Sequence, residues 1–375
     1  LHDALPILSI TSSNYLTVRK NNLSSRGTTS GYTIMLAAAN SNNVTSNRIT
    51  SIGSGNHAQG ITISGSDNNI IEANVINTSG DSSNEGIKLE MNSENNLLSL
   101  NNISTFGGTS SYGIGLSEGG SQYPNNNNIT GNLFLSIAGQ DIGFISAGIN
   151  GTYLIDQYIE DYSIAGVGGI IYFKDSIYGE IRFLDQINGS GTNLSDDVRI
   201  GNNTVTVKSA SNVGLNRSAN ITLYNIGDRG FTNPTILRDG TEDCLADGSC
   251  YNFTALDVID VKFNVSYWSN YSVGEGSLLP EASDVSIWAA TNSTNDNVYF
   301  NYTINSFSED NSYWQWYAND VVIEGTPGIY TDVSFDTFGA GNTNPEGITF
   351  ALGYLWVVDE DDKVVKYYLN GTYTG

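Results

Sequence analysis

The sequence predicts an all-β protein in which a coil of stacked parallel strands is followed by small antiparallel β-sandwich modules. First, the phrase Asn-x-(Ile/Val/Leu)-x-x-Asn-x-(Ile/Leu/Phe) returns about every 27 residues over the first third of the chain. Second, a Gly-Ile-x-(Ile/Leu) phrase keeps the same interval. Third, no segment between the phrases is long and periodic enough for a crossover helix. A fixed period of this kind indicates one structural unit stacked on itself.

The Asn phrase occurs at residues 42–49, 69–76, 96–103 and 127–134, and a fainter copy without the first Asn ends at Leu23. Side chains alternate between the two faces of a strand, so the last apolar residue of each copy is expected to point inward. These residues should stack into one buried ladder: Ile49, Ile76, Ile103 and Phe134.

The second Asn of each copy lies between two inward-pointing residues. Asn tolerates the left-handed backbone that a tight corner needs, and stacked Asn side chains can hydrogen-bond amide to amide. We therefore predict a structural ladder of left-handed corner residues, formed by Asn21, Asn47, Asn74, Asn101 and Asn132.

The Gly-Ile phrase predicts a second set of short alternating strands, at residues 60–63, 86–89 and 113–116. Each strand should pair in parallel with its copy one turn later, which places successive rungs ~4.8 Å apart. Ile61, Ile87 and Ile114 are then expected to form another buried stack.

Together, the two phrases resemble the rungs of right-handed parallel β-helix proteins of the NosD-like type, which are common among archaeal and bacterial surface proteins. The resemblance covers roughly residues 10–150 and implies a right-handed coil in an archaeal-type cell-surface protein. The class includes polysaccharide lyases, glycosidases, copper-maturation proteins and surface proteins of unknown role, so it is specific for fold and weak for activity. Few His, Met and Cys residues are present, which argues against copper handling.

The rest of the chain predicts further units. Residues 1–9 fit no rung and are expected to be an artefactual or disordered leader. The β-helix, with irregular C-terminal rungs and a cap, is expected over 10–199, and a small β-sandwich with a cysteine loop over 200–277. An immunoglobulin-like β module is expected over 283–335. Residues 336–375 resemble one truncated blade of an NHL-type β-propeller, a fold that needs several blades.

Charge excludes some partners. The chain carries 39 acidic and 15 basic side chains, a formal net charge of −24. Nucleic acid and anionic lipid would be repelled, and no membrane span is visible. We therefore expect no nucleic-acid partner and no membrane span.

Acceptor sequences for N-glycosylation (Asn-x-Ser/Thr) are more frequent than random placement gives, although Asn is itself abundant. We interpret them as marks of an extracellular, cell-surface glycoprotein, with candidate sites Asn22, Asn43, Asn77, Asn102, Asn128, Asn150, Asn188, Asn220, Asn252, Asn264, Asn270, Asn301 and Asn370. Cys244 and Cys250 are the only cysteines and are expected to form a disulfide. A metal site there is disfavoured, because neither His lies near in sequence.

Catalytic chemistry has little support in the sequence. A glycosidase or lyase of this shape would present carboxylates on neighbouring rungs, near the separation found in retaining glycosidases. Asp67 and Glu94 are the one pair in register, and two exposed turn acids are the favoured alternative. The acidic run at 359–362 could bind calcium, but a solvated turn is favoured. We predict no metal site and no cofactor.

The sequence thus favours a non-enzymatic secreted or cell-surface protein with a structural or adhesive role. Its expected partners are glycans or other surface proteins. The alternative is a polysaccharide-active enzyme, either a lyase or a glycoside hydrolase.

Overall fold

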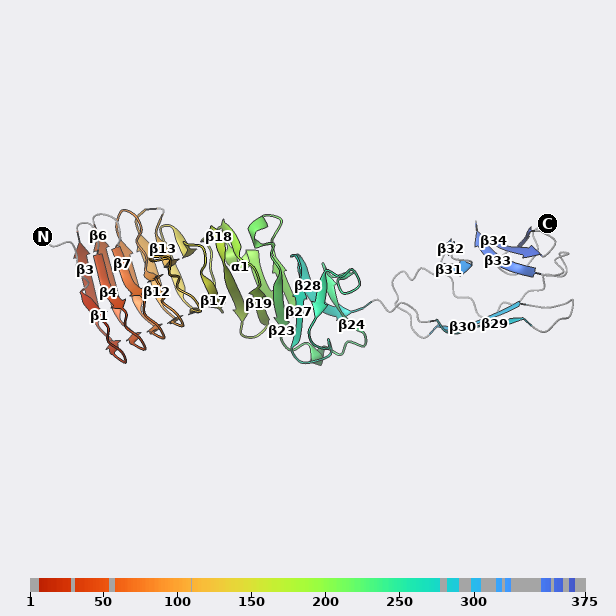
Figure 1. Cartoon of the computed structure of the whole chain (residues 1–375), viewed down its shortest axis with the longest axis horizontal. Helices are drawn as coiled ribbons and strands as arrows, with labels where there is room; N and C mark the ends of the chain where they lie inside the picture. Colours follow the sequence, from red (N-terminus) through yellow and green to blue (C-terminus); the bar gives the residue numbers. More distant parts are fainter. Residues whose placement is uncertain are drawn as a thin grey trace. The chain divides into compact units, whose positions relative to one another are not determined.

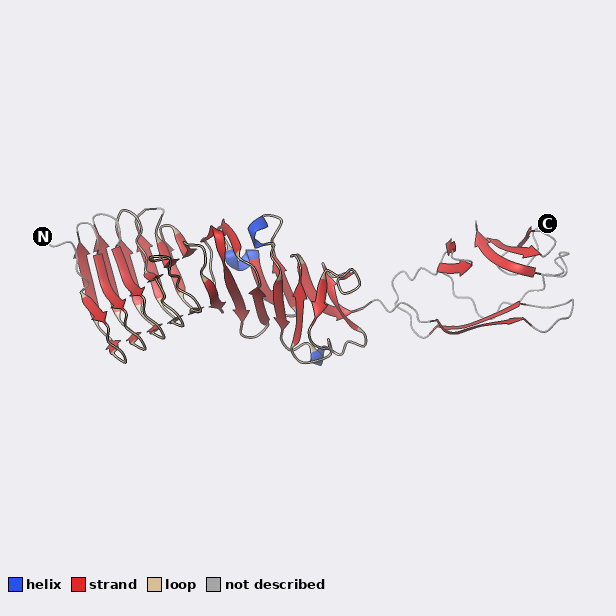
Figure 2. Cartoon of the chain, in the orientation of Figure 1, coloured by secondary structure: helices blue, strands red, loops and turns tan. Residues whose placement is uncertain are grey.

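The structure is a computed structural model. It describes residues 7–27, 31–53, 58–108 and 110–276, followed by seven strands between 282 and 367. The chain divides into two units, Leu1–Gly276 and Ser277–Gly375. Nearly all of the described secondary structure is β (Figure 2), which confirms the predicted all-β class.

The first unit contains a parallel β-solenoid, in which each of the first five turns adds one strand to each of three sheets, A, B and C (Figure 1). Sheet A is formed by β1 (Leu8–Thr11), β4 (Gly31–Ala37), β7 (Ala58–Ser64), β10 (Ile87–Glu90), β13 (Tyr112–Ser117) and β16 (Gln140–Phe144). Sheet B is formed by β2 (Thr17–Arg19), β5 (Asn43–Thr45), β8 (Ile70–Glu72), β11 (Leu97–Ser99), β14 (Asn128–Thr130) and β17 (Asn150–Ile155). Sheet C is formed by β3 (Asn22–Gly27), β6 (Arg48–Gly53), β9 (Val75–Ser79), β12 (Asn102–Phe106) and β15 (Leu133–Ile137).

Like residues stack on like in the core. In sheet A, Ile87 pairs with Ile61 on one side and with Ile114 on the other. Sheet C repeats this arrangement, so both predicted stacks are confirmed, the second formed by Ile49, Ile76, Ile103 and Phe134. The stacked isoleucines are fully buried, and each contributes about 1.5–3 kcal/mol by leaving water.

The glycine that opens each Gly-Ile phrase lies where sheet A closely approaches sheet C and the next rung. A Cβ at Gly60 would lie 2.5 Å from Ile76 Cγ2 and 2.6 Å from the carbonyl oxygen of Gly86. Gly86 is equally crowded, with the Gly113 carbonyl oxygen 2.7 Å away. Any side chain would therefore push successive rungs apart.

The corners of the coil differ from the expectation. The left-handed residues are not the ladder asparagines but the residues directly before them, with φ near +55°: Lys20, Ser46, Ala73, Leu100 and Gly131. Placing the left-handed turn one residue earlier lets each Asn leave the corner with its amide pointing into the core. The prediction of left-handed asparagines was wrong for this reason.

At its C-terminal end, the solenoid changes from parallel to antiparallel pairing. The long strand β18 (Tyr162–Asp175) pairs in parallel with β16 and β17, and antiparallel with β19 (Gly179–Phe183) and β20 (Ile187–Gly191). Sheet B then continues antiparallel through β23 (Ala219–Leu223), β27 (Val261–Val265) and β26 (Cys250–Asn252). The antiparallel strands after residue 200 thus extend a sheet of the coil.

A separate antiparallel sheet lies in the same unit. It contains β21 (Val198–Gly201), β22 (Thr204–Val207), β28 (Asn270–Glu275), β24 (Pro234–Arg238) and β25 (Glu242–Asp243). The short helix α1 (Leu194–Asp197) precedes β21. The turns η1 (Val213–Leu215) and η2 (Gly227–Arg229) lie between β22 and β23 and between β23 and β24. Buried aromatic rings of Phe183, Trp268 and Tyr271 pack against one another.

The described strands of the second unit form three small antiparallel sheets. β29 (Ala282–Ala289) pairs with β30 (Val298–Ile304), and β31 (Gln315–Ala318) pairs with β32 (Val321–Glu324). β33 (Pro345–Ala351), β34 (Tyr354–Asp359) and β35 (Val364–Tyr367) form the third. These three strands coincide with the three sequence segments from which one propeller blade was predicted. The immunoglobulin-like module and the propeller stay predictions.

The expected leader and the acidic run both lie partly outside the described residues. Residues 1–6 lie outside the described residues, but Leu8 and Ser9 belong to β1 and pair with β4, so the end of the expected leader is part of the fold. The acidic run continues past Asp359 into residues 360–362, which lie outside the described part. Among the described residues, no helix is long and apolar enough to cross a membrane.

Candidate functional site

The predicted asparagines form a continuous column of hydrogen bonds through the coil. Asn47 donates from its backbone N and from its Nδ2 to Oδ1 of Asn74, at 2.9 and 3.1 Å. Asn74 repeats this with Asn101 and also donates from Nδ2 to the Val44 carbonyl at 2.8 Å. The column runs from Asn21 to Asn132 and ends on Gln157. Its role is structural, because its central amides are buried and bonded.

A second column was missed by the sequence analysis. The first Asn of each phrase makes the same paired bonds one turn later, through Asn42, Asn69, Asn96 and Asn127. These side chains are also buried. The signal was present in the repeat itself, because this Asn recurs at the same interval as the second one.

The candidate catalytic pair lies in successive turns between sheets A and B. Oδ1 of Asp67 accepts the backbone N–H of Glu94 at 2.8 Å. One turn earlier, Asn40 accepts the N–H of Asp67 in the same way, at 2.7 Å. The Asp67 carboxylate therefore acts as a rung-to-rung connector, interchangeable in role with an Asn side chain. This geometry supplies a structural reason for the register of the pair.

The outer face of sheet A presents a hollow of about 350 Å³. Outward positions on this face follow one another in register, and Lys88 is followed on the next two rungs by Gly115 and Gly143. The two glycines have no side chain, and neighbouring side chains lie over them instead. Glu85 and Ile145 lie close to Gly115, and Tyr112 lies close to Gly143. Charged, aromatic, apolar and hydroxyl groups line the hollow: Glu85, Lys88, Tyr112, Ile145, Ser83, Ser110 and Ser117.

Neighbouring side chains hold the polar groups of the hollow in place. Glu85 is 4% exposed, and its carboxylate accepts a hydrogen bond from Nε2 of Gln59 at 2.8 Å. Nζ of Lys88 forms an ion pair with Glu90 at 2.8 Å, and both side chains are about one-fifth exposed. The ring of Tyr112 lies over Gly143, where a Cβ would be 2.4 Å from it.

The electrostatics keep Lys88 and Tyr112 protonated. Burial by itself lowers the pKa of Lys88, but the hydrogen bond and charge of Glu90, helped by the charge of Glu85, outweigh it and raise the pKa above its ordinary value. Burial, followed by the charge of Glu85, raises the pKa of Tyr112. The hollow therefore offers one cation, one buried carboxylate, several hydroxyls and an aromatic ring. This combination suits a ligand with hydroxyl groups and an apolar face.

The candidate glycosylation asparagines differ in exposure. Asn22, Asn102 and Asn128 are exposed on the outside of the coil, whereas Asn220 and Asn264 are half-buried side by side on β23 and β27. The other described candidates are also half-buried: Asn43, Asn77, Asn150, Asn188, Asn252 and Asn270. Asn301 lies in β30, with its side chain outside the description, and Asn370 lies outside the described residues.

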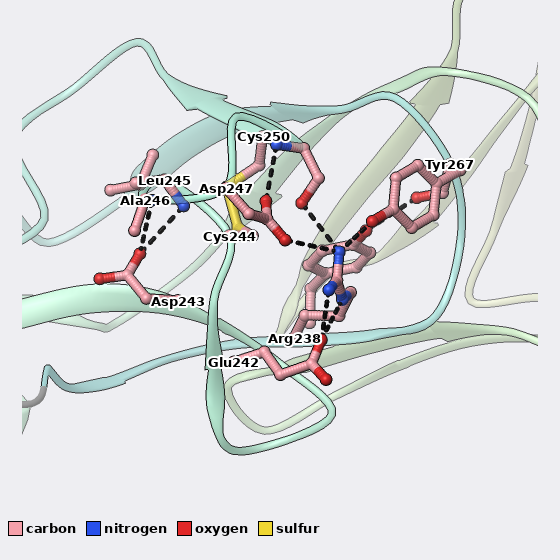
Figure 3. Close-up of a disulfide and its surroundings, with 11 residues drawn as sticks. Arg238, Glu242, Asp243, Cys244, Leu245, Ala246, Asp247, Cys250 and Tyr267 are labelled. Atoms are coloured by element: carbon pink, nitrogen blue, oxygen red, sulfur yellow. Dashed lines mark hydrogen bonds and ion pairs between the residues drawn. A yellow bond between two sulfur atoms is a disulfide. The ribbon is translucent and has the colours of Figure 1, made fainter.

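Cys244 and Cys250 are joined in a loop between β25 and β26, with their Cα atoms 5.4 Å apart (Figure 3). Beside the loop, Arg238 forms ion pairs with Glu242 and with Asp247, the latter at 2.9 Å. Its guanidinium also lies over the Tyr267 ring, 5.4 Å from the centroid. The ion pairs of Arg238 and the disulfide stabilise the same loop, which indicates that both have a structural role.

No group of three or more His, Cys, Asp or Glu side chains that could hold a metal occurs within the described part of the chain. The sequence matches no known protein family and no curated protein. In a comparison with solved structures, the chain is similar to the crystal structure of Dettilon tailspike protein (gp208), with a TM-score of 0.28 and 12% sequence identity. The match covers 69% of this chain and 61% of that chain.

Proposed function

We propose that the chain is a non-catalytic glycan-binding part of a secreted or cell-surface protein, and that the hollow on sheet A binds the sugar. The observation that carries the proposal is the hollow itself, which Glu85, Lys88, Tyr112 and Ile145 line together. Tyr112 offers a ring edge and hydroxyl, and Ile145 an apolar wall, while the serines and Glu85 can exchange hydrogen bonds with sugar hydroxyls.

The secreted location draws support from chemistry elsewhere in the chain. A disulfide is typical of proteins that leave a reducing compartment. Exposed acceptor asparagines on the coil, such as Asn22 and Asn102, are accessible to glycosylation.

A binding role is favoured over catalysis by the state of the ionisable groups. A lyase needs an unprotonated base, whereas the raised pKa of Lys88 keeps its amine charged. The candidate carboxylate of Asp67 already accepts a backbone N–H. The enzymatic alternative rests on Glu85 and Glu90, two carboxylates whose charges both act on Lys88.

The test measures binding of the full chain to a panel of neutral and acidic polysaccharides by isothermal titration calorimetry. Lys88→Met and Tyr112→Ala are expected to weaken binding about tenfold or more, since each removes a contact in the hollow. Met35→Ala is the matched control, because Met35 faces outward in the same column two rungs away. An affinity that is unchanged in both Lys88→Met and Tyr112→Ala would refute the proposed site. Release of reducing or unsaturated ends, abolished by Glu85→Gln, would instead establish the enzymatic alternative.

A further inference from the structure

We infer that the outer face of sheet B, from β17 to β26, is a second binding site, a track for an acidic polysaccharide that carries carboxylate or sulfate groups. The track is separate from the hollow on sheet A and does not depend on it. Its strands follow one another in the order β17, β18, β19, β23, β27 and β26, several of them visible in succession in Figure 1.

One outward column runs through all six strands. Its members pair in register from strand to strand, in the order Tyr153, Tyr172, Arg182, Asn220, Asn264 and Tyr251. With strands ~4.8 Å apart, the column extends over ~24 Å. It presents aromatic rings, a guanidinium and two amides in a line, the groups that stack on sugars and hydrogen-bond to their hydroxyls.

The neighbouring outward column adds positive charge. Lys174 lies opposite Glu180, which is followed by Thr222 and Lys262 on the next strands. The two columns thus contain Lys174, Arg182 and Lys262 against one acid, Glu180. Three of the 15 basic side chains of a chain with a net charge of −24 lie on this one face. These three cations can each contact an anionic group of a polymer.

Arg182 is held in a fixed orientation. Its guanidinium lies over the rings of Tyr153 and Tyr172, at 5.6 and 5.8 Å from their centroids. It is also paired with Glu180, whose side chain is only 9% exposed, whereas the Arg182 side chain is 51% exposed. A guanidinium positioned in this way binds a carboxylate or sulfate without first losing side-chain freedom.

The far end of the track is aromatic. Tyr251 and Phe253 are 64% and 55% exposed, and their rings are 5.6 Å apart. Phe253 donates its backbone N–H to the carbonyl of Lys262 at 2.8 Å, so the residue that carries this cation is a neighbour of the two rings. Exposed aromatic rings can stack on the sugar rings of a polysaccharide.

The two central amides set a condition on the site. Nδ2 of Asn264 donates to Oδ1 of Asn220 and to the carbonyl of Ala219, both at 3.1 Å. Both asparagines are candidate glycosylation sites, and a glycan on either would cover the track. The inference therefore requires these two side chains to be unmodified in the secreted chain.

The experiment measures affinity of the full chain for polygalacturonate, dextran sulfate, neutral dextran and single-stranded oligothymidylate of matched charge, at low and physiological salt. We expect one or both acidic polysaccharides to bind, more weakly as salt rises, and dextran and oligothymidylate to bind at least tenfold more weakly. The arm that binds more tightly identifies carboxylate or sulfate as the recognised group.

Lys262→Gln and Arg182→Gln should each weaken binding about two- to fivefold, and combining them with Lys174→Gln should weaken it further. Arg199→Gln is the charge-matched control, because Arg199 is exposed on β21, outside the track. Met35→Ala, on the outer face of sheet A and outside the hollow, should leave this binding unchanged.

Four outcomes would overturn the inference. They are no binding of either acidic polymer, equal loss in Arg199→Gln and Lys262→Gln, oligothymidylate binding as tight as the polysaccharides, and peptide mapping that finds glycans on Asn220 or Asn264. Loss of binding in Lys262→Gln is not explained by misfolding, because the Lys262 side chain is exposed. This variant should keep the circular dichroism spectrum of the parent.

Discussion

The asparagine column makes a sharp prediction about stability. Replacing Asn74 by Leu removes the oxygen that accepts two bonds from Asn47, one from its backbone N and one from Nδ2. It also removes the donor to Val44 and one of the donors to Asn101. Asn74 is fully buried, so water cannot replace the lost partners.

The expected loss of unfolding free energy follows from the hydrogen-bond donors that lose their acceptor. Two N–H groups of Asn47 lose their partner, and each buried unsatisfied group costs about 1–3 kcal/mol. Burial of the leucine side chain returns about 1.5–3 kcal/mol. The free energy of unfolding should therefore fall by roughly 1–3 kcal/mol, the difference between these two contributions.

The matched control is Asn21→Leu, at the exposed end of the same column. Asn21 donates to Asn47 and to the Arg19 carbonyl, but no later rung is left with orphaned donors when its side chain is removed. Both variants add the same leucine, so only the buried one should lower stability substantially.

The assay is urea unfolding of the full chain, followed by far-ultraviolet circular dichroism. If Asn74→Leu unfolds at the same urea concentration as the parent, or if Asn21→Leu is equally destabilised, the buried hydrogen bonds of the column do not stabilise the coil.

Four further predictions test other features. Gly86→Ala should cost about 2–3 kcal/mol by overpacking, because a Cβ would lie 2.3 Å from Ile103 Cγ2, whereas Gly201→Ala, with only Thr204 Cγ2 nearby at 3.1 Å, should melt close to the parent. Leu100→Asn should stabilise the chain by about 1 kcal/mol, since Leu100 has φ +54° and Asn tolerates that conformation better; a lower melting temperature would contradict this. Burial raises the pKa of Asp141 to about 6, so the folded chain retains a proton that the unfolded chain loses near pH 4, and stability should fall as pH rises through this window. Asp141→Asn, which keeps an acceptor for the Glu160 N–H, should flatten that slope and add up to about 3 kcal/mol at neutral pH; an unchanged pH profile would exclude Asp141 as its source. Cys244→Ser combined with Cys250→Ser should lower the unfolding free energy by about 2 kcal/mol, from the released loop entropy, and reductant should then have no effect on the variant.

Much of the coil could be predicted from the sequence because its contacts repeat at a fixed interval. Residues one turn apart are neighbours in a solenoid, so the spacing of Ile61, Ile87 and Ile114 already states which side chains touch. The same logic located the column that contains Asn74. The repeat did not predict the backbone of the corners. A fixed period shows that a turn occurs but not which of its residues has a positive φ, and in the structure that residue is Ala73 and not Asn74.

The binding surfaces depended on the tertiary structure. The hollow beside Lys88 is lined by residues from separate rungs, such as Glu85, Tyr112 and Ile145. The repeat does not mark these side chains as the walls of one hollow. The track on sheet B joins Tyr153 to Tyr251 through strands that reverse direction. Periodicity determines neighbours where the chain repeats itself, but antiparallel pairing after β18 brings together residues with no common interval, so only the folded chain could decide that surface.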